Sequence, residues 1–430
     1  MLKEKVRQFL QRLATIIKID TLYLARGGFW NTFTFGITSL LSIALVWAFA
    51  NLIPKETYGT YKYVMSIAGS LSFLALTGIN TALTQATAQG QKGLLRYAIK
   101  IQLRWNLIMG VALVGVAGYY YTHNNIVIAA SLLLLAIVTP LIATFNTYSS
   151  YLIGKKLFRV MAYYASLTSI FYTAVMVGIL LLTDNIVAIV AAYCIANLVP
   201  LIFFYLRTLH NSDEEQRNPA PEQKRDLLHF LKHLSVMNVF SNLSQYVDKI
   251  TVFHYIGAIE LAVYGVALAI PDRIRGYFKT LTALVVPKVS LKTIPELRAS
   301  FYLRVFQAFL IGIAASTAYF LIAPFIFHLL LPRYLDAIRY SQALGLVYIF
   351  VLPGSYVGEI FRAHKMIRAL YLSSVTAHVS RIVLFVVLGI VWGVWGVIIA
   401  SLGVHFLGLL LNFVLWEIES RKLLALDLNK

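Results

Sequence analysis

Residues 260–287 read ELAVYGVALAIPDRIRGYFKTLTALVVP, an apolar stretch of membrane-spanning length with charged side chains near its middle. The charged residues are Asp272, Arg273, Arg275 and Lys279. Because a charge at the centre of a bilayer costs about 2.5–3.5 kcal/mol on insertion scales, a chain keeps such a cluster only where it faces protein or water. Three of the four groups are cations, so the stretch indicates a pathway for an anionic substrate.

The rest of the chain has the composition of a membrane protein. Its 430 residues are 59% hydrophobic and only 13% charged, and the mean hydropathy is +0.75. Long apolar runs exclude a soluble domain, and they lack the short alternating pattern of a β-barrel. We predict an all-α polytopic membrane protein with about twelve transmembrane helices in two six-helix lobes around a central cavity. The predicted spans are 27–50, 61–80, 98–121, 125–148, 160–182, 186–206, 232–256, 260–286, 302–331, 340–361, 369–390 and 394–416.

The basic residues lie mostly on one side of these spans. With the N-terminus inside, the outer loops hold only Lys55, Arg333 and Arg339, whereas the inner segments are rich in Lys and Arg. This asymmetry follows the positive-inside rule and predicts that both termini are cytoplasmic. The net charge of +19 therefore indicates topology, and we expect no nucleic-acid partner.

The polar segments predict the domain organisation. Residues 3–18 have one apolar face and dispersed cations, which is typical of a helix lying in the headgroup plane of a membrane. A long polar segment near the middle of the chain divides it into six spans plus six. The predicted parts are an interfacial segment 1–26, an N-lobe 27–206, a cytoplasmic linker 207–231, a C-lobe 232–416 and a cytoplasmic tail 417–430.

The two halves echo each other in sequence. Residues 49–59 read FANLIPKETYG and residues 255–265 read YIGAIELAVYG, so each half has a short outer turn with Glu, then Tyr-Gly opening the next helix. Parallel six-span repeats build a central cavity with a substrate site near the midplane. The echo therefore favours a transporter.

Polar side chains recur at helical spacing in several spans, which predicts polar faces on these helices. Those expected to line the cavity are Asn31, Thr34, Thr38, Asn238, Ser241 and Gln245. Alternatively, such side chains only join one helix to another by hydrogen bonds.

Several motifs, taken in order, resemble a known family. They are 52–61 (LIPKETYGTY), 76–80 (LTGIN), 154–158 (GKKLF), 258–265 (AIELAVYG), 331–337 (LPRYLDA) and 393–397 (GVWGV). Together they resemble the Wzx-like polysaccharide (O-antigen type) flippases of the multidrug/oligosaccharidyl-lipid/polysaccharide exporter superfamily. The resemblance covers almost the whole chain. It implies alternating access, and movement of an undecaprenyl-diphosphate-linked oligosaccharide from the inner to the outer leaflet, as in lipopolysaccharide assembly.

One departure concerns the first span. Cation-coupled drug exporters of this superfamily often carry an acidic residue there, but residues 27–50 contain neither Asp nor Glu. This argues against drug export and leaves a coupling ion, H⁺ or Na⁺, open. No cofactor and no metal site are expected.

Charge suggests roles for the intramembrane residues. Arg273, Arg275 and Lys279 would offset the lost hydration of a diphosphate, for which Arg is well suited. The expected anion path also includes Lys249 and Arg381. Asp248, Asp272 and Glu359 would balance these cations or bind the coupling ion. We expect Glu359 and Arg381 to line the second lobe or to pair with each other.

Two alternatives remain for the function. The first is another exporter of the same fold, for lipid II or drugs. The second is a membrane enzyme of polysaccharide assembly, although such enzymes usually have a large outer loop, which this chain lacks. The charged residues have a purely structural alternative too, as a buried network that fixes helix packing. The family resemblance implies a monomer in a bacterial or archaeal plasma membrane, with polysaccharide polymerase and glycosyltransferases as partners.

Overall fold

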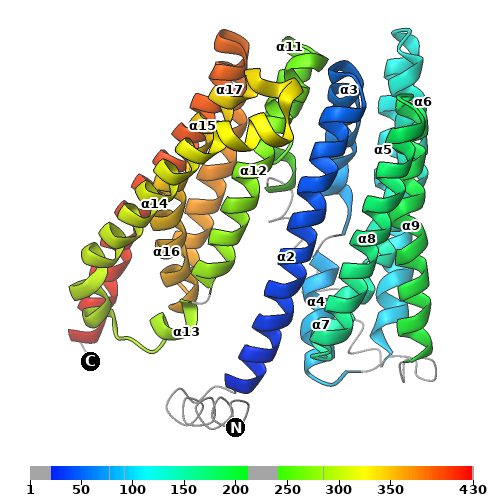
Figure 1. Ribbon diagram of the computed structural model, residues 1–430. Coiled ribbons are helices and arrows are strands. Elements are labelled where there is room, and N and C mark those ends of the chain that lie inside the picture. The colour runs from blue at the N-terminus through cyan, green and yellow to red at the C-terminus, as the bar shows by residue number, and fades with distance from the viewer. Residues whose placement is uncertain (1–20, 77, 92, 212–240, 284, 429–430) are drawn as a thin grey trace, which may run out of the picture. The chain divides into compact units, whose positions relative to one another are not determined.

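The computed structural model describes residues 21–76, 78–91, 93–211, 241–283 and 285–428 (Figure 1). These residues are helices joined by short turns, with no strand among them, which confirms the all-α prediction. The helices are α2 (Thr21–Leu52), α3 (Lys55–Ser70), η1 (Leu71–Leu74), α4 (Gly78–Ala88), α5 (Leu94–Thr122), α6 (Ile126–Phe145), α7 (Thr147–Gly154), α8 (Phe158–Leu182), α9 (Ile186–His210), α11 (Val247–Tyr255), α12 (Ala258–Ala283), α13 (Val286–Val289), α14 (Ile294–Leu330), η3 (Pro332–Ala337), α15 (Ile338–Gly345), α16 (Tyr348–Ala363) and α17 (Ile367–Leu428).

The described residues contain eight helices that are long and apolar enough to span a membrane, or nine if the bent pair 55–74 and 78–88 is one span. The chain is therefore a multi-pass membrane protein, but the predicted number of twelve spans is not confirmed. Part of the difference has two causes. The charged residues of α12 make this helix too polar to be counted, and only residues 241–256 of the seventh predicted span are described. The last two predicted spans share α17, which breaks at Gly393, where φ is +61°.

The chain divides into two compact units. The first comprises Met1–Leu45 and Phe73–Asn238, and the second comprises Val46–Ser72 and Val239–Lys430. Residues 46–72 thus pack with the second half of the chain, although the sequence places them in the predicted N-lobe. The lobe boundaries predicted from the sequence, 27–206 and 232–416, stay a prediction. The interfacial helix 3–18 and residues 212–231 of the predicted linker lie outside the described residues.

The core of the first unit lies where α4, α5, α7, α8 and α9 meet, around Leu83, Leu95, Tyr148 and Phe204. Beside it, α5 and α6 pair along their length and enclose a buried amide. The Asn106 side chain donates to the Thr144 hydroxyl at 3.0 Å. Hydrogen bonding of this kind satisfies a polar group in an apolar environment. Thus the polar residues of α5 hold helices together.

In the second unit, α14, α16 and α17 form an apolar core at one end. Its centre is a stacked pair of fully buried rings, Phe301 and Trp416, with centroids 4.7 Å apart. Large aromatic rings supply much of the packing area between helices. This core fixes α16 and α17, which carry Glu359 and Arg381 of the candidate site.

The Tyr-Gly echo lies where α3 packs against α12. A Cβ added at Gly59 would stand 1.7 Å from the Ala258 carbonyl oxygen, so only glycine permits this approach. Gly265 of the second motif lies beneath the Lys62 side chain, with 3.3 Å from an ideal Cβ to Cε. The two echoed glycines therefore serve one helix contact, which brings Lys62 alongside the charged residues of α12.

Candidate functional site

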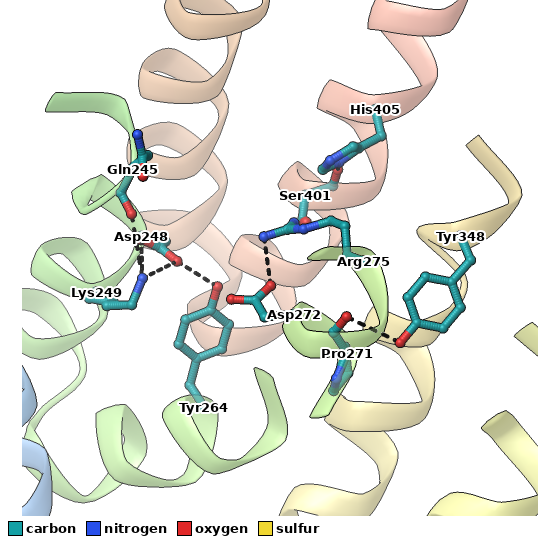
Figure 2. A network of polar contacts seen from close by, with 10 residues as sticks. All are labelled: Gln245, Asp248, Lys249, Tyr264, Pro271, Asp272, Arg275, Tyr348, Ser401 and His405. Carbon is teal, nitrogen blue, oxygen red and sulfur yellow. Dashed lines mark hydrogen bonds and ion pairs between the residues drawn. The ribbon is translucent and has the colours of Figure 1, made fainter. Parts of the chain in front are cut away.

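The charged stretch of the sequence forms part of α12, in the second unit. Asp272 and Arg275 lie one turn apart and form an ion pair, with 2.6 Å between Oδ1 and Nη2 (Figure 2). The Asp272 side chain is 38% exposed and that of Arg275 is 21% exposed. The pair therefore has access from outside the protein rather than lying in a sealed core.

A second ion pair comes from α11. Asp248 is almost fully buried, and the Lys249 ammonium lies 3.3 Å from its carboxylate. The Tyr264 hydroxyl of α12 donates to the same carboxylate at 2.9 Å. Figure 2 shows Tyr264 pointing from α12 toward Asp248, so this carboxylate joins the two helices.

The remaining cations of α12 are Arg273 and Lys279, and both side chains are exposed. Within the described part of the chain, neither has an ion-pair partner or a side-chain hydrogen bond. Lys279 lies within electrostatic reach of Arg275 and Arg381, which are also cationic. Unpaired and mutually repelling cations form a region that favours an anion.

Arg381 approaches this region from α17, which packs against α11. Its guanidinium lies 5.1 Å from the centroid of the Phe385 ring and within electrostatic reach of Asp248. Its Nε is buried and has no hydrogen-bond partner in the described chain. A buried donor without a partner is costly, so a polar ligand there would be stabilising.

Glu359 does not pair with Arg381. It is buried in α16 and forms an ion pair of 2.5 Å with Arg362 one turn later. Of the two roles expected for these residues, the Glu359–Arg381 pair is not formed, because a cation at the helical spacing of three residues is nearer than one on another helix. Their lining of the second lobe stays a prediction.

Lys62 of α3 is a cation that the site prediction omitted. It lies over Gly265, its ammonium is 5.2 Å from the Tyr58 ring centroid, and it is within electrostatic reach of Asp248 and Asp272. The sequence did contain a signal, because Lys62 stands three residues after the Tyr-Gly motif of the first half. Its partner helix, however, follows almost 200 residues later.

The predicted polar lining is only partly visible. The Thr34 and Thr38 hydroxyls of α2 donate to backbone carbonyls of the preceding turn, at 2.9 Å each. Gln245 is exposed, and its side chain donates to the Ser241 carbonyl. Asn31 lies in α2, but its side chain is not described, and Asn238 lies outside the described residues.

A proline shapes α12 beside the ion pair. Pro271 has no N–H, so the Ala267 carbonyl loses its usual helical donor. The Ser341 hydroxyl of α15 donates to that carbonyl at 2.8 Å instead. The Tyr348 hydroxyl donates to the Pro271 carbonyl at 3.3 Å (Figure 2). The turn of α12 around Pro271, which precedes Asp272 and Arg275, is thus hydrogen-bonded from α15 and α16.

His405 of α17 lies on the Arg275 side of the site (Figure 2). Its Nδ1 lies 2.7 Å from the Ser401 carbonyl within α17, and Figure 2 shows the ring near Arg275. Another histidine, His378, bonds the Ser244 hydroxyl at 2.8 Å. The described residues contain no group of three His, Cys, Asp or Glu that could hold a metal ion.

The arrangement defines a class: a polytopic helical membrane protein with an accessible, cation-rich site on a proline-containing helix. Residues 24–290 match the sequence profile of the family described as polysaccharide biosynthesis protein. Because the match covers more than half of the chain, the protein belongs to that family.

Solved structures show the same fold. A multidrug resistance MATE family transporter of the MOP superfamily, in an inward-facing conformation, matches with a TM-score of 0.67 and 15% identity over 90% of this chain and 94% of that one. The lipid II flippase MurJ, in an inward closed conformation, matches with a TM-score of 0.64 and 14% identity over 89% and 86%.

A third match is an outward-facing MATE family transporter, with a TM-score of 0.59 and 13% identity over 93% of this chain and 96% of that one. At these identities the likeness establishes the fold alone. A comparison with curated proteins gave no significant match.

Proposed function

We propose that this protein is a flippase that moves a polyprenyl-diphosphate-linked oligosaccharide, of the undecaprenyl type used in O-antigen assembly, from the inner to the outer leaflet. The observation that carries the proposal is the pair of exposed cations Arg273 and Lys279, which form no ion pair or side-chain hydrogen bond among the described residues. They lie on α12 next to the Asp272–Arg275 pair.

The balance of charge around α12 supports an anionic substrate. Six cations belong to this region, whereas Asp248 and Asp272 are the carboxylates beside them. The cations are Lys62, Lys249, Arg273, Arg275, Lys279 and Arg381. Since each carboxylate already has a cation within 3.3 Å, the excess charge is available to a diphosphate.

The known conformations of the fold support alternating access. One MATE structure is described as inward-facing and another as outward-facing, and both match this chain. We propose that this protein has the same two states and that the lipid tail stays in the bilayer while the headgroup passes. We place it in the plasma membrane with both termini cytoplasmic, as its basic residues favour.

The carboxylates suggest a site for a coupling ion. Asp248 has Lys249 and Tyr264 as partners and is buried, so it suits charge balance and helix packing. Asp272 is more exposed. It is the better candidate to bind H⁺ or Na⁺ when Arg275 leaves it to bind the substrate. We expect a monomer to suffice, and polymerase and glycosyltransferases to act before and after it.

The test is flipping of a fluorescent diphosphate-linked oligosaccharide lipid in proteoliposomes. We expect Arg273→Gln plus Lys279→Gln to reduce the initial rate at least tenfold. The matched control is Lys288→Gln plus Arg304→Gln, which removes the same charge from exposed positions of the second unit outside α12. The control should flip at the wild-type rate.

The outcomes separate the alternatives. Equal rates in both double variants would make the cations structural and refute the proposed path. The recovered lipid should carry its intact oligosaccharide, whereas cleavage or transfer of sugars by the purified protein would indicate an enzyme. Transport of cationic drugs in the absence of flipping would favour the drug exporter that the MATE structures exemplify.

A further inference from the structure

A cavity of ≈ 780 Å³ lies within the first unit, whereas the site on α12 belongs to the second. It is bounded by α2, the end of α7, the start of α8 and the end of α9. Pockets of this size hold small molecules or lipid headgroups. The GKKLF motif, residues 154–158, forms part of its wall, and the proposed flippase path gives this motif no role.

Three cations line the cavity, each from a different helix end. Lys155 follows α7, Arg159 opens α8 and Arg207 lies in the last turn of α9. None of the three has an acidic partner among the residues that the structure describes. The described residues that line the cavity include no carboxylate, so this part of the cavity favours an anion.

Aromatic rings position two of these cations. The Lys155 ammonium lies 5.7 Å from the Tyr151 ring centroid. The Arg159 guanidinium lies 6.0 Å from the ring centroid of Trp30. Such contacts stabilise a cation without neutralising its charge. Gly154 allows the preceding turn to approach α4, because an ideal Cβ there would stand 2.7 Å from the Thr84 carbonyl oxygen.

The cavity continues from the cations along one face of α8, past Val160 and Tyr163 to Ser166. Ser166 is only 8% exposed, and its hydroxyl has no hydrogen-bond partner in the described chain. Seven residues separate it from Arg159, which corresponds to about 10 Å along a helix. Because this hydroxyl lines the cavity and lacks a partner, it is available to a polar atom of a bound ligand.

We propose that this cavity binds the phosphate group of an anionic membrane lipid. Lys155, Arg159 and Arg207 hold the phosphate, and the apolar and aromatic wall covers the start of the chains. The apolar wall distinguishes a lipid from free phosphate. Ser166 donates to an oxygen that lies deeper than the phosphate, which a glycerophospholipid provides in its ester carbonyls and a polyprenyl phosphate does not.

Binding can be measured with purified full-length protein in an uncharged detergent. The probes are fluorescent phosphatidylglycerol with ester-linked chains, its ether-linked analogue, a polyprenyl phosphate and inorganic phosphate. We expect Lys155→Gln plus Arg159→Gln to weaken phosphatidylglycerol binding at least about tenfold, since charge-assisted hydrogen bonds are lost. The matched control, Lys100→Gln plus Arg104→Gln on α5, removes two exposed cations that do not line the cavity and should keep wild-type affinity.

Ser166→Ala tests how deeply the ligand reaches into the cavity. The substitution should lower the affinity for the ester-linked lipid and leave the affinity for the ether-linked analogue unchanged. If polyprenyl phosphate binds as tightly as phosphatidylglycerol and Ser166→Ala has no effect on either, the cavity binds polyprenyl phosphates. That result would overturn the proposal of a glycerophospholipid. An equal loss of lipid affinity in the α5 control would show that the lipid is attracted by the overall positive charge and not by this cavity. Binding of inorganic phosphate as tight as that of the lipid would refute a lipid site.

A crosslinking measurement avoids reliance on variants that fold poorly. Wild-type protein is irradiated with a phosphatidylglycerol that carries a diazirine near its ester linkages, and the labelled peptides are identified by mass spectrometry. Label should appear in residues 155–166 and be displaced by unlabelled phosphatidylglycerol. Label confined to segments that do not line the cavity would contradict the proposal. Because the cavity lies within the first unit, either result is independent of flipping through α12.

Discussion

The Tyr264 hydroxyl donates a 2.9 Å hydrogen bond to the carboxylate of Asp248, which lies 16 residues earlier on the neighbouring helix. Both side chains are buried, and the Lys249 ammonium lies 3.3 Å from the same carboxylate. The contact joins α11 to α12 at the tyrosine of the second Tyr-Gly motif. It gives this tyrosine a physical role in helix packing.

Tyr264→Phe removes this hydrogen bond and retains the ring. We expect destabilisation of about 0.6–2 kcal/mol, which spans the values for side-chain hydrogen bonds between membrane helices. The measurement is unfolding of the purified protein in mixed detergent micelles. Tyr255→Phe is the control because Tyr255 is 56% exposed, and a loss in this control equal to that of Tyr264→Phe would contradict the assignment.

Ser341→Ala should destabilise α12 because the Ala267 carbonyl loses the donor that replaces the missing N–H of Pro271. The expected loss is about 1–2 kcal/mol. Adding Pro271→Ala restores a backbone N–H, so the double variant should recover much of the stability. A double-mutant cycle measures this coupling, and strictly additive losses would refute it.

Gly59→Ala places a methyl group where the Ala258 carbonyl oxygen stands, at 1.7 Å. Over-packing of this kind costs about 1–3 kcal/mol or more, since α3 must move away from α12. Gly178→Ala in α8 is the control, because an ideal Cβ there meets nothing within 4 Å. The control should raise stability slightly through helix propensity. Unfolding midpoints that fall equally in both variants would disprove the close-packing explanation.

Asp272→Asn tests the ion pair with Arg275. Loss of the carboxylate frees the guanidinium, so the affinity for a diphosphate lipid should rise several-fold. Binding of the fluorescent lipid to purified protein provides the measurement, with Asp336→Asn as a control, since that carboxylate pairs with Lys55 instead. If Asp272 also holds a coupling ion, flipping by the variant should become insensitive to H⁺ and Na⁺ gradients. Weaker lipid binding would mean that Asp272 positions Arg275 for the phosphate.

Much of the fold and some of the site could be predicted from residues close together in the sequence. The apolar runs predicted membrane helices because lipid requires every backbone polar group to be satisfied within the helix. Asp272 and Arg275 stand three residues apart, which is the spacing of neighbours on a helix surface, and the structure shows the ion pair there. Glu359 pairs with the nearer Arg362 and not with Arg381, although pairing with Arg381 was one of the two roles expected for it.

The sequence by itself determined the class of protein, the helical architecture and the excess of cations in α12, because these follow from hydropathy and helical period. Only the tertiary structure decided which helices meet. It brought Lys62 to Gly265, Ser341 to Ala267, and Tyr264 to Asp248. Such contacts depend on the packing of side chains from distant segments, and no local pattern encodes the partner of a buried polar group.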